Sequence, residues 1–209
     1  YPNIYSYFDK FLNEHESLDF NKSDIRKLNT ISSFPNYFTS KRKNLLYLET
    51  SPKHFERTEA LVKQRIEKEV ITNFIECVIN NAIDGEYFTI ISLKRHKLKH
   101  RLFDANMHIC FYESILFSCN QLSSTSYSNT KLFIKGDLCS ITDFMTNIVT
   151  NNEGIKVNDL KTMLRSDYGI EVEREKLLTT INNANLYFER IMDRVFSNYE
   201  HYVSISFAI

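Results

Sequence analysis

Apolar positions between Ser51 and Gly85 recur every three or four residues, a spacing that predicts a long amphipathic helix. The stripe consists of Val62, Ile66, Val70, Phe74, Val78 and Ala82. Ser51 suits an N-cap, Pro52 suits the first helical position, and Gly85 suits a C-cap. We therefore expect a helix, continuous or kinked once, from about Pro52 to Asp84, with the other segments packed around it.

Residues 86–138 show a different pattern, in which helical and extended segments follow one another. Tyr87–Leu93 is β-branched and aromatic, which fits a strand or a helix that starts at Thr89. Leu102–Cys119 has a broad apolar face, a serine-rich turn follows, and residues 131–136 form a strand pattern ending in glycine. A helix, a polar turn and a strand in this order are typical of a winged helix-turn-helix around its wing.

The last third of the chain shows four short helical patterns separated by asparagine and glycine residues. These patterns cover residues 143–149, 157–168, 177–184 and 188–199. Short helices with short connections are typical of helix-turn-helix units. The first 50 residues are less regular, with short helical patterns at Ile4–Glu16 and up to Leu28.

The predicted fold class is therefore mainly α, in three segments. Residues 1–85 form an N-terminal helical region that includes the long central helix. Residues 86–138 form a small winged-helix-like α/β module, and residues 139–209 form a C-terminal helix-turn-helix-like bundle.

The composition predicts a packed core and a net charge of zero for the whole chain. The 209 residues are 43% hydrophobic and 13% aromatic, and 26 basic residues balance 26 acidic ones. Any basic surface must then be local. The four cysteines contain no CxxC pair, which favours free thiols in a reducing compartment. Because no apolar run approaches the length of a membrane span and no signal-peptide pattern is present, we expect a cytoplasmic protein without membrane contact.

The most basic part of the chain is Lys94–Arg101, which has five positive charges, two histidines and no acid. Such a stretch beside a wing suits contacts with phosphates, which supply most non-specific affinity for nucleic acid. The predicted nucleic-acid-binding residues are Lys94, Arg95, Lys97, Lys99, Arg101, Lys131 and Lys135. A solvated basic loop, or a loop that docks on an acidic protein, explains the same charges. The cluster Lys41–Lys43 likewise fits either a solvated helix end or a phosphate contact.

The same stretch contains two Arg–His pairs, Arg95 with His100 and Arg101 with His108. Their spacings of four and six intervening residues resemble the Arg-x4–6-His motif of HEPN-type ribonucleases. The resemblance covers only these residues. It implies metal-independent RNA cleavage by the Arg and the His on a helical scaffold, usually within a dimer.

Other chemistry has little support in the sequence. No set of ligands has the spacing of a structural zinc site, and no phosphate-binding glycine loop or nucleophile elbow is present. We therefore expect no cofactor and no metal. The last helical unit has an acid-rich segment at Glu171–Lys176, which favours protein over DNA as its partner.

The function predicted first is a non-enzymatic, regulatory nucleic-acid-binding protein whose partner is DNA or RNA. The second hypothesis is a protein-interaction module, an adaptor or inhibitor, working with a protein partner or within a larger assembly. The third is the ribonuclease that the HEPN-like spacing implies. The sequence leaves the oligomeric state open.

Overall fold

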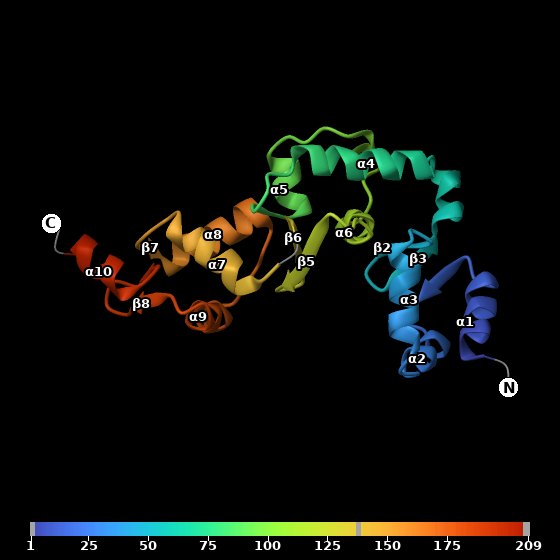
Figure 1. Ribbon diagram of the computed structural model, residues 1–209, viewed down its shortest axis with the longest axis horizontal. Coiled ribbons are helices and arrows are strands. Elements are labelled where there is room, and N and C mark those ends of the chain that lie inside the picture. The colour runs from blue at the N-terminus through green and yellow to red at the C-terminus, as the bar shows by residue number, and fades with distance from the viewer. Residues whose placement is uncertain (1–2, 137–138, 207–209) are drawn as a thin grey trace. The chain divides into compact units, whose positions relative to one another are not determined.

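The computed structural model describes residues 3–136 and 139–206 (Figure 1). These residues form two compact units. The first unit contains residues 3–81 and 99–122, and the second contains residues 82–98, 123–136 and 139–206. The predicted domain bounds at residues 85 and 138 stay a prediction.

The first unit begins with helices that alternate with short strands. Its elements are α1 (Ile4–Asn13), β1 (Ser17–Asp19), α2 (Ser23–Asn29), α3 (Phe34–Lys43), β2 (Tyr47–Ser51), β3 (His54–Arg57), the 3₁₀ helix η1 (Thr58–Gln64), α4 (Lys68–Asn81), the 3₁₀ helix η2 (Arg101–Ala105) and α6 (Ile109–Phe117).

The second unit contains the remaining elements, apart from the first residue of β5. They are β4 (Tyr87–Phe88), α5 (Ile90–Arg95), β5 (Leu122–Tyr127), β6 (Thr130–Lys135), α7 (Ile141–Thr150), β7 (Ile155–Lys156), α8 (Val157–Tyr168), α9 (Arg174–Asn183), β8 (Tyr187–Glu189), β9 (Arg194–Phe196) and α10 (Tyr199–Ser206).

One order of elements recurs three times along the chain: helix, strand, helix, helix, strand, strand. The runs are α1 to β3, α4 to β6 and α7 to β9. In each run the last strand lies in the middle of a three-stranded sheet, so the sheet orders are β1-β3-β2, β4-β6-β5 and β7-β9-β8. The described fold is thus mixed α/β, with one small sheet for each run.

The first sheet is a hairpin extended by a short edge strand. Strand β3 pairs antiparallel with β1 and with β2. Lys53 has a φ of 63° in the turn between β2 and β3, which reverses the chain. An apolar core lies between this sheet and α1, α2 and α3, and consists of Phe8, Leu12, Leu18, Ile25, Leu28, Phe34, Phe38, Tyr47 and Phe55.

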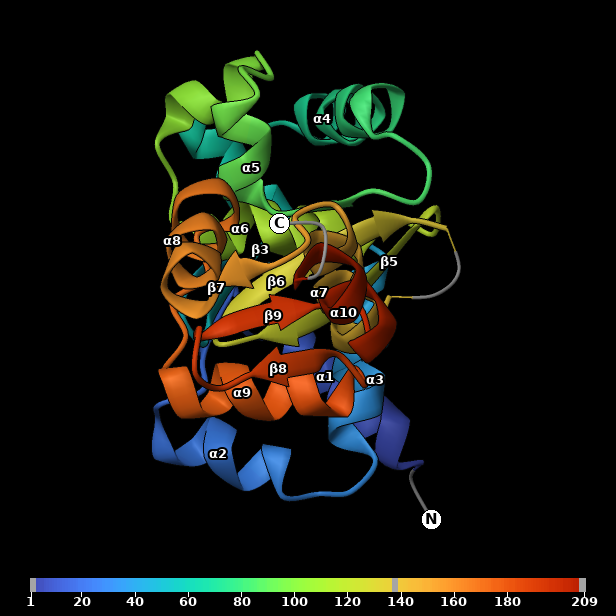
Figure 2. The same ribbon diagram turned by 90° about the vertical axis from the view of Figure 1, so that its left-hand side faces the viewer.

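The last sheet and three helices enclose the main core of the second unit. Strand β9 pairs antiparallel with β7 and β8, and β8 runs beside α9 (Figure 2). Apolar residues of α7, α8 and α9 fill this core, among them Phe144, Ile148, Leu160, Leu164, Leu177 and Ile181. Helix α8 ends at Gly169, whose φ of 69° suits a glycine C-cap.

The predicted long helix is wrong. Ser51 ends a strand, residues 54–57 form the next one, and Arg65 has a left-handed φ of 61°. Only α4, Lys68–Asn81, is an α-helix in this region, so the apolar stripe is confirmed only within it. Phe74 and Val78 are fully buried, whereas Val62 is 52% exposed.

The mainly α class is wrong as well. The predicted helical bundle at 139–209 contains the sheet β7-β9-β8, and the pattern at 188–199 forms a hairpin rather than a helix. Residues 86–138, predicted as a winged-helix-like module, supply β4, α5 and β6 to one unit and η2 and α6 to the other. The reason is that strand pairing depends on partners distant in the chain, which local periodicity does not reveal.

Candidate nucleic-acid interface

The predicted basic stretch is divided between the two units. Lys94 and Arg95 form the last turn of α5, and Lys97 follows with a φ of 59°, all exposed in the second unit. Lys99 and Arg101 are exposed in the first unit, where Arg101 begins η2. Lys94, Arg95 and Lys97 thus belong to one unit, and Lys99 and Arg101 belong to the other.

Several of the predicted cations already have acidic partners. Arg95 Nη1 lies 2.6 Å from Asp167 Oδ1, and Lys135 Nζ lies 2.9 Å from Asp84 Oδ1. Lys131 and Lys135 are half-buried positions of β6. In the described ranges no ion pair involves Lys97, Lys99 or Arg101. These three cations are therefore the members of the predicted set with uncompensated charge.

The two histidines of the HEPN-like pairs act as helix caps. His100 Nδ1 accepts a hydrogen bond of 3.1 Å from the Leu102 N–H at the start of η2, and the ring lies 5.3 Å from Phe74. Burial lowers the pKa of His100 below its usual value. His108 accepts from the Cys110 N–H at the start of α6. A local backbone N–H thus binds the Nδ1 atom of each imidazole.

In helix-turn-helix proteins the second helix of the pair is the one that enters the DNA groove. In the middle run this helix is α6, and none of its residues is exposed. It packs against β2 and α3, and the Glu49 backbone N lies 3.1 Å from Ser114 Oγ. A helix covered in this way offers no side chains to a groove.

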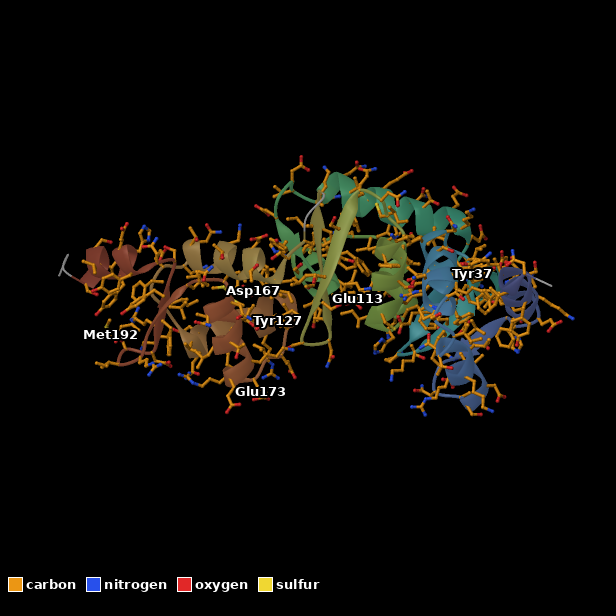
Figure 3. The ribbon with its side chains drawn as sticks, turned by 60° about the horizontal axis from the view of Figure 1, so that its bottom comes forward. Tyr37, Glu113, Tyr127, Asp167, Glu173 and Met192 are labelled. Carbon is orange, nitrogen blue, oxygen red and sulfur yellow. The ribbon has the colours of Figure 1, made fainter. Side chains whose placement is uncertain are left out.

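The corresponding helix of the last run, α9, is exposed but has acidic neighbours. Glu171, Glu173 and Glu175 surround its first turn and are exposed, and Glu173 projects away from the ribbon (Figure 3). Arg174 is held by a bidentate ion pair with Asp193, with distances of 3.1 and 2.5 Å. A phosphate at this helix start would meet carboxylates, and the preference of this segment for a protein partner stays a prediction.

Helix α3 of the first run has the opposite character. Asn36, Ser40 and Lys43 are exposed and lie along one side of it. The last turn contains Lys41, Arg42 and Lys43. Their positive charges interact favourably with the negative, C-terminal end of the helix dipole. Lys41 Nζ lies 2.8 Å from Asp9 Oδ1, so Lys41 is anchored to α1.

A cavity of about 600 Å³ lies beside α3, between α2 and the β2–β3 hairpin. Its lining combines aromatic rings, hydroxyls and charged groups from these elements: Phe20, Arg26, Asn29, Thr30, Pro35, Phe38, Thr39, Arg42, Glu49, Lys53 and Phe55. The lining contains three cations, Arg26, Arg42 and Lys53, and one carboxylate, Glu49, so it has a net positive charge.

Arg42 is the most enclosed of these cations. Its guanidinium carbon lies 4.8 Å from the ring centre of Phe55 and 5.1 Å from that of Phe117, at cation–π distance. Nη2 lies 3.5 Å from Glu49 Oε2, while the buried Nε has no hydrogen-bond partner among the residues that the structure describes. Burial lowers the pKa of Arg42, but a guanidinium remains charged at neutral pH.

Sequence reasoning noted Lys41–Lys43 but missed the rest of this site. Arg26, which is next to Lys27, and Lys53 lie 27 positions apart in the printed chain, and neither belongs to a pronounced basic run. Only the pairing of β3 with β1 and β2 brings them to one cavity.

Other kinds of site are not evident in the part of the chain that the structure describes. There, no three His, Cys, Asp or Glu side chains are grouped so that they could hold a metal ion. Within the same residues no helix has both the length and the apolar character needed to cross a membrane. Comparison of the chain with protein-family models, curated protein sequences and solved structures gave no significant match.

Proposed function

We propose that the protein binds nucleic acid without catalysing a reaction, and that α3 is its main contact element. The order α1-β1-α2-α3-β2-β3, with β3 in the middle of the sheet, supports a winged helix-turn-helix assignment for residues 3–57. In that type of domain the second helix of the pair enters the major groove and the hairpin lies along the backbone.

One comparison carries the proposal: of the three corresponding helices, only α3 combines an exposed polar face with a basic end. Helix α6 is covered, and α9 begins among glutamates. The net charge of residues 3–57 agrees with this choice, since this segment has nine Lys and Arg residues and seven Asp and Glu residues. In this scheme Lys97, Lys99 and Arg101 supply additional phosphate contacts.

The test is the binding of fluorescent duplex DNA, single-stranded DNA and hairpin RNA, measured by anisotropy at several salt concentrations. Replacing Asn36 and Lys43 by Ala should weaken binding about tenfold. It should also lower the salt slope, which is the steepness of the fall of log affinity with log salt concentration, by about one. The matched control replaces Asn182 and Lys176, an exposed Asn and Lys on α9, and should change affinity less than about twofold. Equal losses in the two double variants would contradict the role of α3.

Protein binding through the last run is the second candidate function. Ile191, in the turn between β8 and β9, is 94% exposed, and Met192 beside it is 42% exposed. Figure 3 labels Met192. The turn is held in place, because Met192 N–H donates to Glu189 Oε2 and Asp193 pairs with Arg174. An apolar tip on a fixed turn suits insertion into an apolar hollow of a partner protein.

A display library of random peptides, selected on the purified protein, tests this candidate. Selected peptides should bind the parent protein at least about tenfold more tightly than the Ile191→Ser variant. The control is Val62→Ser, which removes an exposed apolar side chain from the other unit. If the selected peptides bind the parent, Ile191→Ser and Val62→Ser equally well, the apolar tip is not the binding site.

A further inference from the structure

The cavity beside α3 has features that a groove-reading helix does not require. We propose that this cavity binds one nucleotide unit, with the phosphate at Arg26 and Lys53 and the base against Phe20. The inference rests on the proposed function only for its class of partner, since the cavity itself is independent of the exposed face of α3.

The size of the cavity fits such a ligand. Its volume of about 600 Å³ lies in the range of roughly 300–1,000 Å³ that is typical of small-molecule sites. It is also mixed in character, with aromatic rings and a few polar groups, as such sites usually are.

The aromatic part of the lining has one ring with accessible surface. Phe20 lies 5.2 Å from Phe38 and 5.2 Å from Phe55, measured between ring centres. Phe38 and Phe55 are 5% and 6% exposed, whereas Phe20 is only half-buried. Phe20 is therefore the ring on which a planar base can stack, supported from behind by the two buried rings.

The charged part of the lining favours an anion. No ion pair involves Arg26 or Lys53 anywhere in the described ranges, and both side chains are exposed. Arg42 is compensated only in part, by Glu49 at 3.5 Å. A phosphate would supply the missing negative charge and accept hydrogen bonds from the cations.

Hydrogen bonds fix the main chain of Lys53 relative to that of Phe20. The Phe20 N–H donates to the Lys53 carbonyl at 2.9 Å, across the β1–β3 edge of the sheet. The Lys53 N–H donates to Glu49 Oε1 at 2.9 Å. The backbone that presents the stacking surface is thus tied to the backbone that presents one of the cations, and Glu49 lines the same cavity.

The nucleotide unit can come from two sources, a free mononucleotide or a nucleotide within a single strand. Calorimetric titration with AMP, GMP, CMP and UMP tests the first source. Anisotropy with a labelled single-stranded twelve-residue oligonucleotide tests the second. Arg26→Ala and Lys53→Ala should each weaken the binding about tenfold, because each removes one charge-assisted contact with the phosphate.

The matched control is Lys27→Ala, which removes the neighbouring exposed cation of α2 that does not line the cavity. Phe20→Leu keeps an apolar side chain and should weaken binding without unfolding the protein. A normal melting temperature for the Arg26, Lys53 and Phe20 variants ensures that the comparison concerns binding.

The outcomes separate this inference from the proposed function. If the Asn36 and Lys43 variant loses duplex binding while Arg26→Ala and Lys53→Ala bind mononucleotide and single strand like the parent, the cavity inference is wrong and the function stands. If mononucleotide binds and depends on Arg26 and Lys53 but no nucleic acid binds, the cavity inference stands and the function is wrong. Absence of binding to any mononucleotide or single strand also overturns the inference.

Discussion

Gly169 lies directly against the side chain of Ile91. A Cβ added to Gly169 would stand 2.1 Å from Ile91 Cδ1 and 3.0 Å from Ile91 Cγ1. The same glycine ends α8 with a φ of 69°, and its carbonyl accepts a hydrogen bond from Thr130 Oγ1. This contact joins α5 to the end of α8 inside the second unit, so both the backbone conformation and the packing require glycine here.

Replacing Gly169 by Ala should destabilise the protein by about 2–5 kcal/mol. A left-handed Ala costs about 1–2 kcal/mol and overpacking against Ile91 adds about 1–3 kcal/mol. Gly85→Ala is the control, because Gly85 also has a positive φ but no atom within 4 Å of the added Cβ. Urea unfolding measures both. Equal losses in the two variants would show that the contact with Ile91 contributes nothing.

Phe74 and Val62, which share the apolar stripe in the sequence, should respond very differently to truncation. Phe74→Ala should cost about 3–5 kcal/mol, because a fully buried ring in contact with Phe103 and Tyr112 leaves a cavity. Val62→Ala should change stability by less than about 0.5 kcal/mol, since Val62 is 52% exposed. Chemical denaturation measures the free energy of unfolding of both variants. A large loss of stability in Val62→Ala would show that Val62 is part of the core.

His100 should matter for stability rather than for RNA cleavage. His100→Ala should cost about 1 kcal/mol through loss of the cap on the Leu102 N–H, and His100→Asn should retain much of it. Burial lowers the pKa of His100, so below about pH 6.5 the unfolded chain binds a proton that the native protein does not yet bind. The free energy of unfolding should therefore decrease as the pH falls below about 6.5. Ribonuclease activity that disappears in His100→Ala and His100→Asn alike would support the HEPN-like hypothesis instead.

Cys110 should make the protein less stable as the solution becomes alkaline. Burial raises the pKa of the Cys110 thiol from 9.0 to about 12. Above pH 9 the unfolded chain loses this proton while the native protein keeps it, so native stability falls as the pH rises toward 12. Unfolding free energies at pH 8, 9 and 10 should therefore decline less steeply in Cys110→Ala than in the parent. Parallel curves would be inconsistent with a buried protonated thiol.

The three uncompensated cations of the basic stretch offer a direct test of its role. Replacing Lys97, Lys99 and Arg101 together by Ala should leave the melting temperature unchanged, because all three are exposed. If they contact phosphates, the salt slope of nucleic-acid binding should fall by about three. The companion variant Arg95→Ala, which also loses its ion pair with Asp167, should lower it by at most about one. An unchanged slope in the triple variant would confine the interface to the first run.

The sequence alone determined several local features of this protein. Thr89 caps α5 as the pattern suggested, with its side chain and that of Ser92 exchanging hydrogen bonds with the backbone. The glycines at 85, 136, 154 and 169 all adopt positive φ and lie outside the helices. Val70, Phe74 and Val78 are buried on one side of α4. Each of these features depends on neighbours within one or two helical turns, which periodicity and capping rules describe.

Tertiary structure alone decided where the sheets lie and which basic residues meet. The apolar spacing around Ile191 is helical, yet pairing of Phe188 with Val195 makes it a hairpin and leaves Ile191 exposed. Helix α6 lies in the segment Leu102–Cys119, whose broad apolar face the sequence shows, but only the fold decides that β2 and α3 pack against it. Arg26, Arg42 and Lys53 line one cavity because α2, α3 and the β2–β3 hairpin pack around a shared core. Such juxtapositions arise from contacts between residues distant in the chain, and no local pattern encodes them.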